Sequence, residues 1–174
     1  MEVVGSNRDH FDSLCWQVDL SNNSIGGYKI YDPESREYKT TSTPEGPQAI
    51  ADAIRVTPSM TSIDLRNNGF GPEGAKALAP AIRDTSITSV GKDGLNLKGN
   101  RLGDEGWGAI FAAVCSSTVS KVTSIDASFE GIGPEGAKLI GQALRNSVNP
   151  SLTQVCAAVG SSWGRVVVPA CSLP

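Results

Sequence analysis

The chain of 174 residues repeats part of its own sequence, and this repetition restricts its fold more than any other feature. Residues 60–84 read MTSIDLRNNGFGPEGAKALAPAIRD and residues 121–146 read KVTSIDASFEGIGPEGAKLIGQALRN. Both copies contain TSID, then GPEGAK, then a closing Ala-Ile-Arg or Ala-Leu-Arg. Self-similarity of this kind indicates an array of stacked supersecondary units, each of which buries its apolar face against the next.

Each unit predicts a short strand followed directly by a helix. The strand residues fall on the spacing L-x-x-L-x-L-x-x-N-x-L, which the copy at residues 60–84 fills with Met60, Ile63, Leu65, Asn68 and Phe70. The helix is predicted to begin at Gly71-Pro72-Glu73, because proline suits the first helical position and an acidic residue suits the first turn. Its apolar stripe recurs at i, i+3, i+4 and i+7, as Ala75, Leu78, Ala79 and Ile82.

Two further units follow the same pattern, so that four repeats are predicted. The first repeat has the strand residues Cys15, Val18, Leu20, Asn23 and Ile25, and its helix opens at Pro44-Glu45-Gly46. The third repeat has the strand residues Leu95, Leu97, Asn100 and Leu102, and its helix opens at Asp104-Glu105-Gly106. Residues 151–155 begin a fifth repeat.

Two insertions interrupt the array. The interval from Asn23 to Asn68 is longer than that from Asn68 to Asn100, which places an extra segment at about residues 27–43. We predict that this insertion is a small hairpin or an ordered loop. It contains Tyr28, Tyr31 and Tyr38, which suit a binding surface, although a structural role is equally compatible with the sequence. A shorter insertion near residues 91–94 leaves the register of the third repeat open.

The repeated asparagine is predicted to form a structural ladder that satisfies buried backbone groups. Asn23, Asn68 and Asn100 can each donate and accept hydrogen bonds where the chain leaves the strand. The fourth repeat has Glu130 at this position, and an ionised carboxylate cannot donate. We therefore expect Glu130 to turn outward or to leave a local defect, and sequence drift near the end of the array explains the change more simply than a function does.

These motifs resemble the long, helix-containing leucine-rich repeats of the ribonuclease inhibitor-like class. The resemblance is carried by Ile63-Asp64-Leu65, Asn68 and residues 71–75, with their counterparts at 125–126 and 133–137, and it covers about residues 14–155. It implies an α/β solenoid in the shape of a horseshoe, with parallel strands on the concave face and helices on the convex face. The smaller spacing of strands than of helices gives the same curvature from first principles.

The class implies recognition of a protein partner through the concave face. Alternate strand side chains point away from the core, which exposes a predicted column of Asp19, Asp64, Asn96 and Asp126. Arg66 and Lys98 lie beside this column and can offset its charge, whereas Trp16 and Phe129 are the candidate aromatic anchors. A solvated polar face without a ligand is at least as compatible with the sequence.

Other functions have little support in the sequence. The net charge of −3 and the scattered basic residues argue against binding to nucleic acid, and no apolar run is long enough to span a membrane. We found no phosphate-binding loop, nucleophile elbow or metal-ligand spacing, so we predict no catalysis, cofactor or metal. The alternative we retain is activation of a small GTPase, by analogy with the Ran activators of the same class.

The two ends of the chain differ from the array. Residues 1–13 are predicted to form a frayed lead without a secretory signal, which favours a cytoplasmic protein. Residues 156–174 abandon the repeat pattern, as expected either of a truncated array or of an improvised cap over the open edge. The chain is predicted to be a monomer unless that edge pairs. The four cysteines are interpreted as small apolar residues rather than disulfides.

Overall fold

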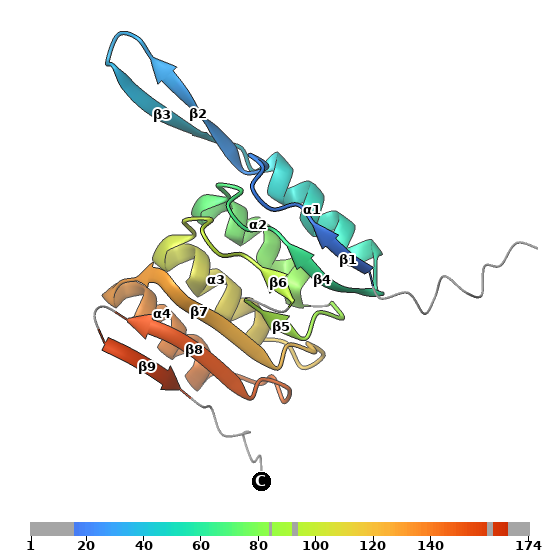
Figure 1. The fold of residues 1–174 in the computed structure, drawn as a ribbon. Coiled ribbons are helices and arrows are strands. Elements are labelled where there is room, and N and C mark those ends of the chain that lie inside the picture. Colours follow the sequence, from blue (N-terminus) through green and yellow to red (C-terminus); the bar gives the residue numbers. More distant parts are fainter. Residues whose placement is uncertain (1–15, 84, 92–93, 160–161, 167–174) are drawn as a thin grey trace, which may run out of the picture.

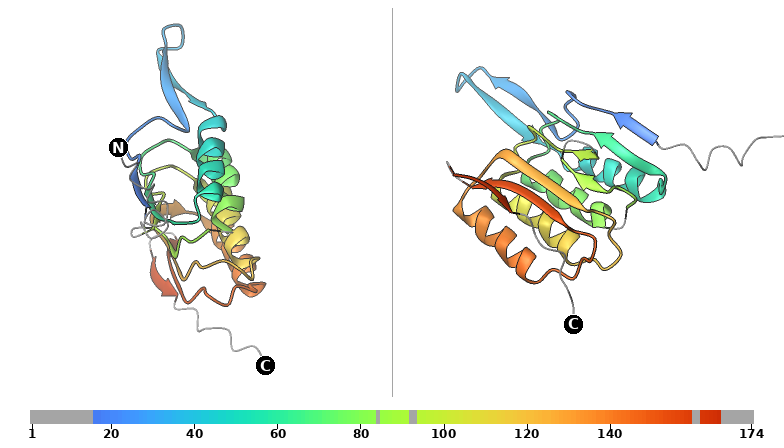
Figure 2. Two further views of the ribbon diagram at one scale, coloured as in Figure 1. Left: turned by 90° about the vertical axis from the view of Figure 1, so that its right-hand side faces the viewer. Right: turned by 60° about the horizontal axis from the view of Figure 1, so that its bottom comes forward.

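The repeats form two layers, with helices on one side and strands on the other (Figures 1 and 2). The computed structural model describes residues 16–83, 85–91, 94–159 and 162–166. The described strands form a seven-stranded sheet and a separate two-stranded sheet, and the helices cover one face of the larger sheet. This architecture confirms the predicted α/β solenoid. We call the face of the seven-stranded sheet that is turned away from the helices the open sheet face.

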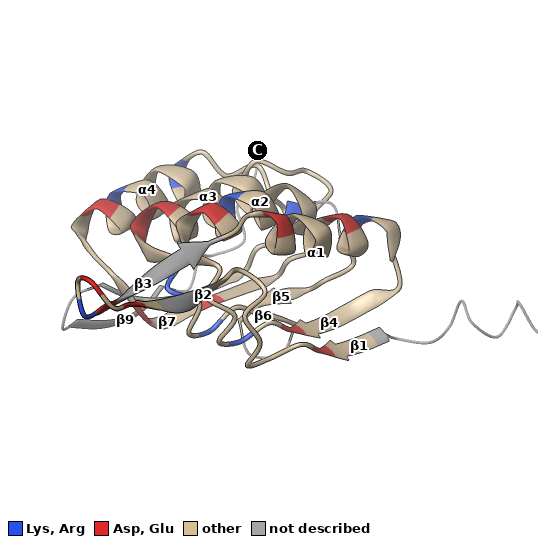
Figure 3. Ribbon diagram, turned by 90° about the horizontal axis from the view of Figure 1, so that it is seen from above, with Lys and Arg blue, Asp and Glu red and all other residues tan. Residues whose placement is uncertain are grey.

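The helices begin where the repeated Pro-Glu-Gly or Asp-Glu-Gly element occurs. Their bounds are α1, Glu45–Val56; α2, Gly71–Arg83; α3, Gly103–Cys115; and α4, Pro134–Arg145. Each has an acidic residue in its first turn, where the positive end of the helix dipole favours it. These residues form the row of acidic positions at one end of the helix layer in Figure 3. Both GPEGAK copies are helical, as the sequence predicts.

The strands of successive repeats pair in parallel. Their bounds are β1, Trp16–Asp19; β4, Met60–Asp64; β5, Ser89–Val90; β6, Leu95–Asn96; β7, Ser124–Ile132; β8, Gln154–Val159; and β9, Ser162–Val166. The order across the sheet is β1-β4-β6-β5-β7-β8-β9. Ile63 of β4 and Ile125 of β7 lie in this same sheet, and both are buried against the helices. Only β9 among these strands runs antiparallel to its neighbour.

The asparagines join neighbouring repeats as predicted from their hydrogen-bonding capacity. Asn100 is fully buried, and its Oδ1 accepts from the Asn68 amide at 2.9 Å. Its Nδ2 donates to the carbonyl oxygens of Leu65 and Leu97, both at 2.8 Å. Asn68 is also buried and donates to the Leu20 carbonyl of the first repeat at 2.8 Å. Asn23, in contrast, is exposed and bonds only within its own turn.

The insertion in the third repeat adds a strand to the sheet. β5 lies between β6 and β7, so that Val90 pairs with both Leu95 and Ile125. The amide of Gly91 donates to the Leu95 carbonyl at 2.8 Å. β5 is only two residues long, so it separates the strands of the third and fourth repeats only where those strands begin. Past Gly91, a space remains between the two repeats.

A hairpin occupies the segment where the sequence predicts the insertion in the first repeat. β2, Gly27–Asp32, and β3, Glu37–Ser42, pair in antiparallel fashion from Gly27 opposite Ser42 to Asp32 opposite Glu37. The hairpin forms its own two-stranded sheet and projects from the end of the solenoid (Figure 1).

The array ends in an antiparallel pair of strands. β8 continues the parallel sheet as the strand of a fifth repeat, and it runs past the expected boundary at residue 155. β9 then turns back along β8, from Val159 opposite Ser162 to Val155 opposite Val166. Residues 1–15 and 167–174, which include His10, Cys15 and Cys171, lie outside the described residues.

Candidate functional site

The boundary between the third and fourth repeats departs from the repeat pattern at several positions that meet in space. We call the position held by the repeated asparagine, and by Glu130 in the fourth repeat, the ladder position. The residue before it has a left-handed backbone in each repeat, with φ of 58° at Asn22, 55° at Asn67, 73° at Gly99 and 65° at Phe129. Asparagine and glycine tolerate this conformation, whereas a bulky aromatic residue does not adopt it readily. Phe129 nevertheless occupies it, with its side chain 67% exposed.

Glu130 replaces the ladder asparagine and does not reproduce its contacts. Its Oε1 accepts from the amide of Gly99 at 3.4 Å, one residue before the position that the earlier asparagine engages. Burial raises the pKa of this carboxyl group above its usual value, and Asp126 adds to the rise. The Gly99 amide, the Trp107 indole and Lys98 act in the opposite direction. The expected defect is therefore present, but the side chain is half-buried rather than turned outward.

Trp107 stands where the second and fourth repeats have alanine. Within the GPEGAK element and its counterpart GDEGWG, Trp107 corresponds to Ala75 and Ala137. Its side chain is 1% exposed and packs at a tilt against Phe111, with ring centroids 6.4 Å apart. Its indole Nε1 has no hydrogen-bond partner in the described part of the chain. The N–H favours the charged form of Glu130, although the two groups fall short of hydrogen-bond geometry.

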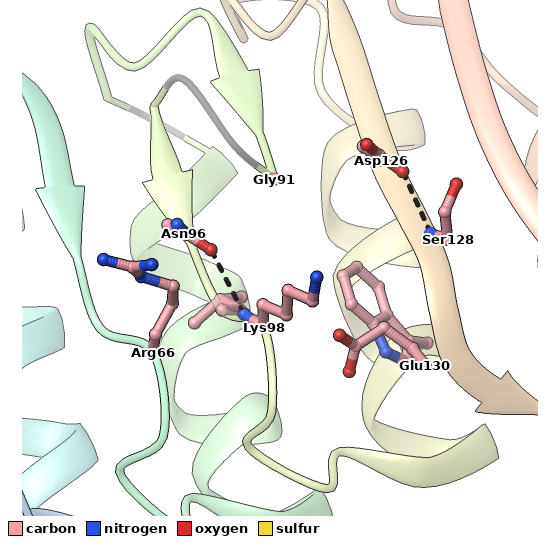
Figure 4. Close-up of a pocket in the computed structure, with 9 residues that line it drawn as sticks. Arg66, Gly91, Asn96, Lys98, Asp126, Ser128 and Glu130 are labelled. Carbon is pink, nitrogen blue, oxygen red and sulfur yellow. Dashed lines mark hydrogen bonds between the residues drawn. The ribbon is translucent and has the colours of Figure 1, made fainter. Parts of the chain in front are cut away.

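These departures surround a pocket on the open sheet face. Its volume is about 230 Å³, and Figure 4 shows it between the segment after β6 and the strand β7. The lining residues are Arg66, Gly91, Asn96, Leu97, Lys98, Trp107, Asp126, Ser128 and Glu130. We call this space the Trp107–Glu130 pocket. A more open hollow shares Arg66, Lys98 and Glu130 with it and extends to Arg101 and Phe129.

Gly91 is necessary for the close approach of β5 to β7. Its φ is 135°, and a Cβ atom on it would lie 2.7 Å from the Cβ of Asp126. The insertion therefore brings a backbone segment without a side chain against Asp126, where the regular array would place the strand of the third repeat. The carboxylate of Asp126 is left facing the pocket rather than another polar side chain of the column.

The charges around the pocket are unevenly compensated. Arg66 is held by Asp64, with Nε 2.8 and 2.9 Å from the two carboxylate oxygens and an Nη 2.7 Å from one of them. Lys98 places its ammonium 5.8 Å from the centre of the Phe129 ring. Asp126 accepts from the amide of Ser128 at 3.0 Å. No ion pair joins Asp126 or Glu130 to a cation among the described residues.

Two segments of the chain match a known protein family model. A model described as Leucine Rich repeat matches residues 57–79 and 95–111, which contain β4, β6 and parts of α2 and α3. The matched segments are leucine-rich repeats. A search of curated proteins found no match for it. In the described segments, no helix is long and apolar enough to cross a membrane, and no group of three side chains is suited to hold a metal ion.

Each residue of the predicted polar column makes the same local hydrogen bond to the backbone. The side-chain oxygen accepts from the amide two residues later in the pairs Asp19–Ser21, Asp64–Arg66, Asn96–Lys98 and Asp126–Ser128. The Ser21 contacts hold the pKa of Asp19 below its usual value. The column is also shorter than predicted, because Asp19, Asp64 and Asn96 are in register whereas β5 separates Asn96 from Asp126.

The structure brings together about half of the predicted binding residues. Arg66, Asn96, Lys98 and Asp126 line the pocket, and Phe129 lines the adjoining hollow. Asn96 is 9% exposed, so it lies on the pocket wall and not on the solvated surface we expected. Trp16 and Asp19 lie in β1 at the edge of the sheet. Tyr31 in the hairpin is 50% exposed, whereas the side chains of Tyr28 and Tyr38 are outside the described set.

Sequence reasoning missed Trp107 and Gly91 and undervalued Glu130. At helical spacing, Trp107 is one more apolar residue in an apolar stripe, and only its alignment with Ala75 and Ala137 reveals it as a replacement. The same alignment reveals Glu130 against Asn68 and Asn100. The replacement of alanine by tryptophan and of asparagine by glutamate, both at one repeat boundary, is the feature of the sequence that could have indicated this site.

Proposed function

We propose that this leucine-rich repeat chain is a non-catalytic module that binds a protein partner through the open sheet face, with the β2–β3 hairpin adding a contact. Leucine-rich repeats generally mediate interactions between proteins. The observation that carries the proposal is the convergence of the β5 insertion, Trp107 and Glu130 on one pocket of that face, with Phe129 in the adjoining hollow.

Stability alone does not account for this convergence. The ladder asparagine bonds both neighbouring repeats, and a buried bond of this kind contributes about 1 kcal/mol. Replacing it with Glu130 and placing Phe129 in a left-handed conformation both oppose folding. Positions that break the local rules of a fold are the ones where function is expected.

The hairpin suits a second contact with the same partner. It extends from the end of the solenoid and exposes Tyr31, whose ring can bury a large area at low entropic cost (Figure 1). The exposed segment between β2 and β3 contains both signs of charge, in Glu34 and Arg36. A partner that spans the sheet face and the hairpin would bury more surface than either element offers alone.

A matched pair of variants tests the proposed binding face. Asp126→Lys reverses a charge on the open sheet face, and Glu135→Lys makes the same change on α4, which lies in the helix layer. Proteins captured from native lysate by the wild-type chain are quantified for each variant. A partner of the open sheet face is depleted at least about tenfold by Asp126→Lys and is retained by Glu135→Lys. Capture that both variants preserve contradicts the proposed face.

The proposal includes assignment to the ribonuclease inhibitor-like class and a cytoplasmic location. A full helix in each of the four repeats supports the class. Cys115 and Cys156 are free thiols, and burial raises the pKa of Cys115, which suits a reducing compartment. Activation of a small GTPase is the alternative function, and the described residues favour it less because Arg66 is bound by Asp64. Stimulated GTP hydrolysis by a panel of small GTPases would support this alternative.

A further inference from the structure

The Trp107–Glu130 pocket contains two carboxylates that form no ion pair with the residues the structure describes. Among those residues, Asp126 accepts from the Ser128 amide at 3.0 Å, and Glu130 accepts from the Gly99 amide at a long distance of 3.4 Å. Lys98 is the cation whose charge acts on Glu130, and no ion pair is described for it. Asp64 neutralises Arg66. The other charged residues that line the pocket, Lys98, Asp126 and Glu130, have a net charge of −1 when Glu130 is ionised.

The pocket also contains a buried donor that has no acceptor. Trp107 is 1% exposed, and its Nε1 lines the pocket without a hydrogen-bond partner among the described atoms. A buried donor left in this state costs about 1–3 kcal/mol. The Glu130 carboxyl group is close enough for the indole N–H to favour its charged form, yet it accepts from Gly99 and lacks hydrogen-bond geometry with Trp107. Burial disfavours ionisation of Glu130, so a cation beside it would favour the carboxylate, which is the stronger acceptor for this donor.

An exposed aromatic ring lies in the hollow that adjoins the pocket and shares Lys98 and Glu130 with it. Phe129 is held there by its left-handed backbone, and its face already attracts the Lys98 ammonium at 5.8 Å. A planar cation can lie on an aromatic face while it donates to carboxylates beside the ring. Carboxylates on one side and an aromatic face on the other favour a guanidinium group over an ammonium group, because the guanidinium is flat and donates in several directions.

We infer that the Trp107–Glu130 pocket accepts an arginine side chain of the protein partner. The guanidinium donates to Asp126 and Glu130 and lies against Phe129. It thereby holds Glu130 ionised, and the second carboxylate oxygen becomes available to Trp107 Nε1. An acidic side chain would meet two carboxylates, and an apolar side chain would leave both carboxylates and the indole N–H without partners. The inference rests on the proposed function for the source of the arginine, but its test does not require the partner.

The experiment titrates the full chain with small probes and follows the indole N–H resonance of Trp107. The probe is arginine with an acetylated amino group and a methylamide at its carboxyl group. Two comparison probes are the same derivatives of citrulline, which has a similar shape but no charge, and of glutamate. We expect a saturable downfield shift with arginine only, because the N–H gains an acceptor. A single residue is expected to bind with a dissociation constant of about 1 mM or weaker.

Variants assign the binding to the two carboxylates. Glu130→Gln and Asp126→Asn each are expected to weaken arginine binding about tenfold, whereas Glu135→Gln on α4 leaves it unchanged. The backbone amide spectrum of each variant shows whether it is folded. If a variant does not fold, the comparison of arginine with citrulline on the wild-type chain still decides the matter.

Three results would overturn the inference. These are equal binding of citrulline and arginine, preferential binding of glutamate, and the absence of a saturable shift with arginine. Each of them leaves the proposed protein-binding function standing, since that function is judged by partner capture with Asp126→Lys. Conversely, arginine binding without partner capture would support the pocket and count against the proposed function.

Discussion

The Oε1 atom of Glu130 accepts from the amide of Gly99 at 3.4 Å, whereas at the preceding repeat boundary Asn100 accepts from Asn68 at 2.9 Å. The carboxylate thus engages an earlier residue through a longer contact and donates nothing in return. Together with the β5 insertion and Trp107, this difference distinguishes the boundary that forms the pocket from the preceding boundary.

Glu130→Asn is expected to stabilise the protein. An asparagine at this position can accept from the Asn100 amide and donate to the Leu97 carbonyl, as Asn100 does for the previous repeat. We expect the free energy of unfolding at neutral pH to rise by about 1 kcal/mol, measured by urea denaturation. Binding of capped arginine should fall at the same time. A less stable variant would show that Glu130 is an integral part of the folded boundary.

The stability of the wild-type protein should decrease as pH rises through the titration of Glu130. Its pKa in the folded protein is raised above the ordinary value of 4.5, so the folded state binds more protons than the unfolded state within that window. Stability is therefore lost as pH rises from 4.5 through the raised pKa. The groups facing Glu130 are Lys98, Asp126, the Trp107 N–H and the Gly99 amide.

Glu130→Gln checks this dependence because glutamine does not titrate. We expect the variant to gain stability relative to the wild type as pH rises through the window, in urea unfolding at a series of pH values. Glu135→Gln, measured in the same way, corrects for the loss of one charge. A difference that is independent of pH, or one that grows as pH falls, would contradict the burial of Glu130.

Asn100→Ala is expected to be strongly destabilising. The side chain is fully buried and provides bonds to Leu65, Leu97 and Asn68, so its loss leaves several buried backbone groups without partners. We expect a loss of about 3 kcal/mol or more in the free energy of unfolding. Asn23→Ala is the matched control, because Asn23 is exposed and should lose about 0.5 kcal/mol or less. Equal losses would refute the ladder as a source of stability.

The sequence was sufficient to predict the fold because the fold repeats. Ile63 and Ile125 occupy equivalent strand positions, and the two GPEGAK copies open equivalent helices, so one interpretation of the pattern applies four times. Each repeat supplies an independent check on the apolar spacing. An error in any single repeat, such as the open register near residues 91–94, does not disturb the others.

The pocket could not be predicted in the same way, because it arises where the repeats differ. The position of β5 depends on whether Gly91 can approach Asp126, which the sequence does not reveal. The orientation of Trp107 depends on the space that β5 opens, and Glu130 acquires its environment from both. These three residues are far apart in the chain, and their meeting is a property of packing rather than of spacing.

The last prediction concerns the hairpin, which should be separable from the solenoid. Gly27 lies opposite Ser42, and the Thr43 amide donates to the Gly26 carbonyl at 3.0 Å, so the two ends of the hairpin are already adjacent. Replacing residues 28–41 with the turn dipeptide Asn-Gly would preserve this closure. Because β2 and β3 pair only with each other, the melting temperature should change little, as calorimetry can show. Capture of the partner should weaken if Tyr31 contributes to binding, and a steep fall in melting temperature would instead make the hairpin part of the folded core.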